Sequence, residues 1–107
     1  MRLPHTVTVL RAPLVTDAKG NKVRDWTTAT QTPAAAWVQP LTSDEQTLGQ
    51  DRVTSRWRIF LDPETVALAT DRIVWQGDTY QVDGEIQAWV TQVGVHHYEG
   101  YLLRVSG

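Results

Sequence analysis

DRIVWQGDTYQVDG, residues 71–84, is the stretch of sequence that decides the fold class. Strand-forming residues at 72–75 and 79–82 flank Gln-Gly-Asp at 76–78, which predicts two antiparallel strands joined by a tight turn. Asp83-Gly84 is a second hairpin signal, because both residue types are favoured in such turns. Consecutive antiparallel strands are therefore expected in this part of the chain.

Alternation of apolar and polar residues with a period of two recurs along the rest of the chain, and no long stretch has helical periodicity. Pro13 and Pro40 are expected to end strands, residues 17–21 predict a hairpin turn, and residues 66–69 fit either a helix or a strand. Further strands are predicted over residues 6–12, 22–28, 34–39, 52–61 and 93–105. Six to eight short strands with frequent turns predict an all-β fold, an antiparallel barrel or sandwich, and we favour a small antiparallel β-barrel.

Length and composition limit the classes of protein that this chain can belong to. It has 107 residues, of which 41% are hydrophobic and 21% charged, so we expect one globular domain over residues 1–107. It contains no cysteine, which excludes disulfides, thiolate nucleophiles and cysteine zinc sites. We expect no membrane partner, because no apolar run approaches the roughly 20 residues of a spanning helix and no signal-peptide core follows Met1.

The charge and the tryptophan content point to packing rather than to nucleic-acid binding. The net charge of −2 argues against a free-standing nucleic-acid binder, which usually carries a basic excess. Most of the tryptophans are expected in the core, and one or two at a subunit interface. The five tryptophans are Trp26, Trp37, Trp57, Trp75 and Trp89.

Motifs of catalysis and of metal binding are absent from the sequence. It contains no Gly-Lys-Ser/Thr phosphate loop, no Gly-x-Ser-x-Gly elbow and no His-Glu-x-x-His helix. His97 and Glu99 share one face of the predicted last strand, with His96 beside them, but a third ligand is missing. We therefore predict no enzyme, no metal and no other cofactor.

Two polar features remain as candidate sites. The polar segment 42–50 is expected to be a mobile loop between strands. Arg52, Arg56 and Arg58 share one face of the predicted strand 52–61. They could line a DNA channel, pair with acidic residues of a neighbouring subunit, or form a solvated outer face, and we prefer pairing between subunits over contact with DNA.

Residues 71–84, followed by His-His-Tyr-Glu-Gly-Tyr-Leu at 96–102, resemble the head-closure proteins of long-tailed bacteriophages. Members of this family are also called head-to-tail stoppers or head–tail joining proteins. In them a strand that begins Asp-Arg leads into a Gly turn, a Tyr-x-Val-x-Gly hairpin and a closing strand. The resemblance covers most of the chain in order.

The resemblance implies a virion protein of the head–tail interface that is assembled in the host cytoplasm. It implies a six-fold or twelve-fold ring that closes the DNA channel after packaging. The implied partners are further copies of the chain, a portal-bound adaptor ring, tail terminator or tail tube proteins, and packaged double-stranded DNA.

The family's channel-closing element is a long loop between barrel strands, and residues 42–50 match it by position and polarity. These residues are Thr42, Ser43, Asp44, Glu45, Gln46, Thr47, Leu48, Gly49 and Gln50. Two alternatives stay open: a small β-barrel that binds nucleic acid or a peptide, and an enzyme whose site is not recognised.

Overall fold

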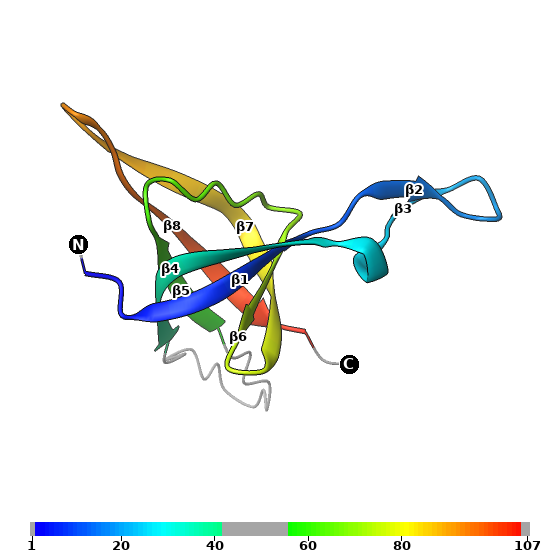
Figure 1. The fold of residues 1–107 in the computed structure, drawn as a ribbon, viewed down its shortest axis with the longest axis horizontal. Helices are drawn as coiled ribbons and strands as arrows, with labels where there is room; N and C mark the ends of the chain where they lie inside the picture. Colours follow the sequence, from blue (N-terminus) through cyan, green and yellow to red (C-terminus); the bar gives the residue numbers. More distant parts are fainter. Residues whose placement is uncertain (1, 42–55, 106–107) are drawn as a thin grey trace, which may run out of the picture.

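Six strands form a closed barrel, and a separate hairpin projects from it (Figure 1). The computed structural model describes residues 2–41 and 56–105. Around the barrel the strands follow the order β1-β4-β5-β8-β7-β6, and each adjacent pair is antiparallel. The predicted all-β barrel is confirmed. The barrel strands are β1 (His5–Arg11), β4 (Thr30–Leu41), β5 (Arg56–Leu61), β6 (Arg72–Trp75), β7 (Asp78–Thr91) and β8 (Gly94–Arg104).

The core fills the inside of the barrel, because alternate side chains of every strand point inward. Burial of each large apolar side chain contributes roughly 1.5–3 kcal/mol to the free energy of folding. Trp57, Trp75, Ile86 and Tyr98 are partly buried and pack against the core. Its largest fully buried apolar side chains are Ile59, Leu61, Ile73, Leu102 and Val7.

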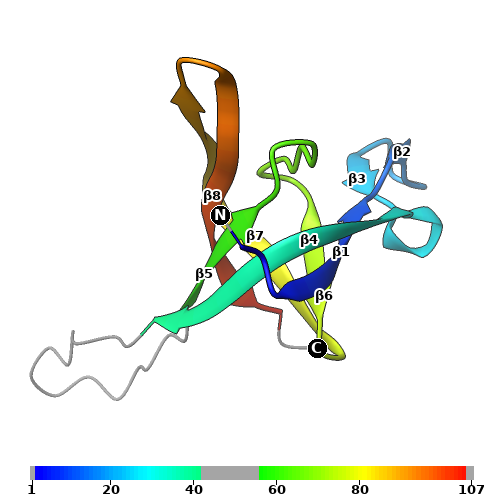
Figure 2. The same ribbon diagram turned by 60° about the vertical axis from the view of Figure 1, so that its left-hand side comes forward.

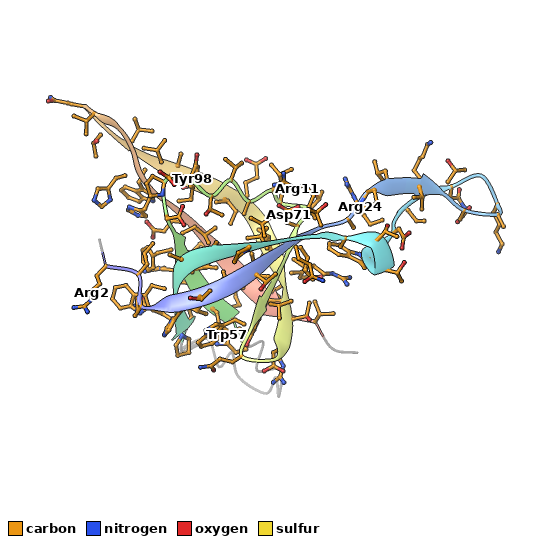
Figure 3. All side chains as sticks on the ribbon, viewed as in Figure 1. Arg2, Arg11, Arg24, Trp57, Asp71 and Tyr98 are labelled. Atoms are coloured by element: carbon orange, nitrogen blue, oxygen red, sulfur yellow. The ribbon has the colours of Figure 1, made fainter. Side chains whose placement is uncertain are left out.

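The barrel closes through a short seam between β1 and β6. These strands pair over only three positions, whereas β1 pairs with β4 over its whole length. Just beyond the seam, the Nε and Nη2 atoms of Arg11 donate to the carboxylate of Asp71 at 2.9–3.3 Å (Figure 3). That carboxylate is buried, with Asp71 only 2% exposed, and it also accepts the Leu68 N–H at 2.8 Å.

Arg11 thereby fixes the segment that precedes β6 onto the end of β1. Its Nη2 donates a further hydrogen bond to the Val66 carbonyl at 3.0 Å. The hydrogen bond to Asp71 raises the pKa of Arg11 above its ordinary value. Residues 66–69, which fitted either a helix or a strand, form neither, and Ala67 is buried among them.

The first hairpin joins β2 (Leu14–Thr16) to β3 (Lys22–Arg24), with the turn where residues 17–21 predict it. Gly20 has φ +84, and the Asp17 carboxylate accepts the backbone N–H groups of Lys19 and Asn21. The prediction of a continuous strand over 22–28 is wrong beyond Arg24. A 3-10 helix, η1 (Trp26–Thr28), replaces it, because the Asp25 carboxylate caps the Thr27 N–H.

The prediction of a second hairpin at Asp83-Gly84 is also wrong. The chain continues in β7 through these residues to Thr91 and reverses only before Gly94. Gly84, with φ +84, lies in a bulge where the register with β8 shifts between Asp83 and Gln87. Positive φ serves a turn and a bulge equally well, so the local signal did not distinguish them. The turn predicted at residues 76–78 is confirmed, with Gln76 and Gly77 at positive φ between the paired residues Trp75 and Asp78.

Pro40 does not end its strand, contrary to prediction, and Pro33 also lies inside β4. Pro33 pairs only with β1 and Pro40 only with β5, so each proline has an unpaired side where a missing N–H breaks no ladder. β7, with 14 residues, is the longest strand described. The strand predicted over 52–61 is observed from Arg56, and its first four residues lie outside the described part.

The Asp71 carboxylate is expected to matter more for stability than a surface carboxylate with a similar ion pair. Asp71→Ala leaves the Leu68 N–H and Arg11 without their partner, so the free energy of unfolding should fall by about 3 kcal/mol. Asp78→Ala removes a 2.7 Å pair with Arg104 in which both side chains are partly exposed, and should cost under about 1 kcal/mol. Urea unfolding followed by tryptophan fluorescence checks both, and equal losses would contradict this account of the seam.

Candidate functional site

Two arms extend from different sides of the barrel (Figures 1 and 2). In Figure 1 they extend in opposite directions, and in Figure 2 one rises above the barrel while the other lies to its right. We call residues 14–24 the β2–β3 arm and residues 83–101 the β7–β8 arm. Both expose large apolar side chains, which a folded chain usually buries or reserves for contacts. These side chains are Leu14, Val15, Val23, Trp89, Val90 and Val93.

The β2–β3 arm is basic, and all six of its strand residues are exposed. Val15 and Val23 are directly paired and form one apolar face. Its charged residues are Asp17, Lys19, Lys22 and Arg24. A two-stranded hairpin is marginally stable on its own in water, so an arm of this kind gains stability from a surface that covers it.

Contacts at its base join the β2–β3 arm to the barrel. The Asp25 N–H donates to the Pro13 carbonyl at 3.0 Å. The guanidinium of Arg72, on β6, lies 4.1 Å from the ring centroid of Trp26, a cation–π contact that holds η1. These contacts therefore fix the direction in which the arm leaves the barrel, while its two faces stay exposed.

An aromatic band crosses the outer face of the barrel on four neighbouring strands. It consists of Trp37 on β4, Phe60 on β5, His97 on β8 and Trp89 on β7, with successive ring centroids 5.7, 5.7 and 5.8 Å apart. Trp89 is stacked on His97 at an interplanar angle of 8° and is 53% exposed. His97 is buried at 8% exposure, although it faces outward, because the band covers it.

An open pocket of about 400 Å³ lies next to the band, where β7 bulges away from β8. Gly100 lies opposite the bulge, and a Cβ at this position would collide with the side chain of Ile86. Three carboxylates line the pocket, and residues 83–101 contain no lysine or arginine. The lining residues are Asp83, Gly84, Glu85, Gln87, Trp89, Glu99, Gly100 and Tyr101.

Two of the three predicted arginines lie beside this pocket. Arg56 pairs with Asp83 of the same chain at 2.8 Å, and its guanidinium lies 4.8 Å from the Tyr101 ring centroid. Arg58 Nη2 contacts the Tyr101 hydroxyl at 3.4 Å, while its Nε is buried without a hydrogen-bond partner among the described residues. Arg52 lies outside the described residues. Pairing of these arginines between subunits stays a prediction.

The predicted loop residues 42–50 also lie outside the described part of the chain. Their nearest described neighbours, Leu41 and Arg56, are register partners at the end of β4 and the start of β5. The two described residues that flank segment 42–55 therefore lie side by side on the barrel.

His96, His97 and Glu99 form a hydrogen-bonded group. The Nδ1 atoms of His96 and His97 lie 2.8 Å apart, and His97 Nε2 lies 3.1 Å from a Glu99 carboxylate oxygen. Within residues 2–41 and 56–105, no three or more histidine or acidic side chains are placed to hold a metal ion. None of the helices found there is long and apolar enough to cross a membrane.

Comparison with known proteins identifies one family. The model of a family described as phage head completion protein matches residues 1–99. A search of the curated proteins found no match.

Several solved structures are similar to this chain, among them proteins from Shigella flexneri 2a and Bacillus subtilis. Protein SF1141 from Shigella flexneri 2a is 18% identical, with a TM-score of 0.68 over 98% of this chain and 95% of that one. Protein xkdH from the phage-like element PBSX of Bacillus subtilis is 13% identical, with a TM-score of 0.48 over 94% of this chain and 92% of its own. The likeness to SF1141 shows a shared fold.

The tryptophans of the band are expected to contribute less to stability than those at the core. Trp57 packs against the core and meets Tyr80 edge to face at 5.0 Å, so Trp57→Ala should lower the free energy of unfolding by about 3 kcal/mol. Trp89→Ala should cost under about 1 kcal/mol, because that ring is half exposed. Urea unfolding monitored by circular dichroism tests the difference. If Trp89→Ala lowered the free energy of unfolding as much as Trp57→Ala, the β7–β8 arm would have to be part of the stabilising core.

Proposed function

This chain belongs to the phage head completion protein family and is a structural component of the virion, and we propose that it forms a ring that closes the DNA channel after packaging. The ring lies at the head–tail interface, on a portal-bound adaptor ring, and provides the surface on which tail terminator or tail tube proteins dock. Its symmetry is six-fold or twelve-fold, and packaged double-stranded DNA lies in its channel.

The family match over residues 1–99 carries this proposal. The shape of the chain supports the ring, because a subunit needs one surface for each of its two neighbours. The closed barrel has two arms on different sides, and both expose apolar side chains (Figure 2). Burying them against other subunits would provide the apolar contact that holds a ring together.

Electrostatics support a channel that releases DNA. A protein that grips DNA places several lysines or arginines on the phosphates. Residues 42–50 carry only Asp44 and Glu45 as charges, so they repel phosphates. We propose that these residues from each copy meet near the axis to close the channel, and that contact with the tail moves them aside.

Disruption of the gene tests the proposal as a whole. Electron microscopy of the resulting particles is expected to show tailless heads that have lost their DNA, beside complete free tails. Supplying the intact chain from a plasmid should restore tailed particles. If intact tailed particles formed without this protein, the connector role would be rejected and a binding module for nucleic acid or a peptide would be favoured.

Deletion of residues 43–49 tests the channel-closing part separately. The deletion keeps seven residues between Leu41 and Arg56, enough to join two paired positions, so the barrel should unfold in urea as the intact chain does. Heads that carry the shortened chain are expected to lose their DNA, as measured by nuclease sensitivity of the genome. Heads that keep a nuclease-resistant genome would show that these residues are not the plug.

A further inference from the structure

We propose that the β2–β3 arm of one copy docks on the acidic pocket and aromatic band of the next copy, so that one arm-to-arm contact repeats around the ring. The inference rests on the proposed ring and names the surfaces that would build it.

The charges of the two arms are complementary. The β2–β3 arm carries Lys19, Lys22 and Arg24 against one carboxylate. The pocket on the other arm is lined by three carboxylates and by the rings of Trp89 and Tyr101. Asp83 already pairs with Arg56 and Glu99 with His97 of the same chain, so Glu85 is the lining carboxylate with no ion pair among the described residues. Carboxylates beside aromatic faces attract a lysine or arginine side chain through both charge and cation–π contact.

The apolar surfaces of the two arms also match. The Val15 and Val23 face of the hairpin is uncovered, and so is Trp89 in the wall of the pocket. Docking would bury these side chains together. Lys22 starts from the opposite face of the hairpin to Val23, so its long, flexible side chain would bend around the edge of the hairpin to bring its ammonium group to the carboxylate of Glu85 at the rim. The β2–β3 hairpin, which is only marginally stable on its own, would gain a surface to pack against.

The placement of the arms explains why such a contact makes a ring. The two surfaces differ from each other and lie on different sides of the barrel (Figures 1 and 2). A contact between unlike surfaces leaves one free surface of each kind after every step, so it continues from copy to copy until the ring closes. A two-fold dimer would instead use the same surface twice.

The natural lack of cysteine allows a direct test by cross-linking. Lys22→Cys and Gln87→Cys change exposed residues, one on each arm, and together they provide one thiol for each side of the contact. Heads assembled with this full-length double variant, in place of the native chain, are treated with a short bismaleimide. We expect a ladder of dimers, trimers and larger species on a denaturing gel.

Control variants make the ladder interpretable. Either cysteine alone should give no species beyond a dimer, and Lys22→Cys with Thr6→Cys, an exposed position on β1, should give no ladder. Heads that contain the double variant but give no cross-link, or a dimer alone, would overturn the docking while leaving the connector role intact. The connector role itself fails only if particles form normally without the gene.

Charge reversal provides a second, independent readout. Lys22→Glu should lower incorporation into heads by about tenfold or more, because it replaces an attraction to the Glu85 carboxylate by a repulsion. Adding Glu85→Lys should restore incorporation, whereas Arg2→Glu, the reversal of an exposed charge that belongs to neither arm, should leave it unchanged. Equal incorporation of Lys22→Glu and Arg2→Glu, or failure of the Glu85→Lys rescue, would contradict the docking.

Discussion

The ion pair between Arg11 and Asp71 is the contact on which the closed barrel depends most. Every other barrel junction has a ladder of four or more register pairs, whereas β1 and β6 share three. Asp71 sits at the end of this short seam, where its buried carboxylate binds the Arg11 guanidinium and the Leu68 N–H. Because a buried carboxylate is stable only when its oxygens are paired, this contact favours the register in which β1 and β6 meet.

Closure determines how the chain can associate with others. Each barrel strand is hydrogen-bonded to neighbours on both of its sides over part of its length, so the barrel offers little free edge to an added strand. Exposed large apolar side chains are concentrated instead in two places. One is the β2–β3 hairpin, which forms a sheet of its own, and the other is the end of the β7–β8 hairpin that is farther from the barrel. Association through these projections suits a ring, since a rigid barrel sets the angle between successive contacts.

Sequence patterning predicted the strands where burial alternates with a period of two, as in residues 6–12, 72–75 and 93–105. It was wrong where a local signal has two structural meanings. Asp83-Gly84 fits a turn or a bulge, and Pro40 ends a strand only if both sides of that strand must pair. Partners far along the chain decide between these meanings, and no short window contains them.

The candidate surfaces could be predicted only in part, because they too depend on partners far along the chain. Alternation placed Arg56 and Arg58 together on one strand face, but cross-strand register decides that Asp83 and Tyr101 lie beside them. The bulge sets that register: residues 84–86 of β7 face Gly100 alone, so the strand gains two residues. An even number keeps side chains on their original faces, and Trp89 therefore stays on the outer surface with Asp83. The feature that the sequence suggested as a turn is thus what extends β7 into an arm and opens the acidic pocket beside it.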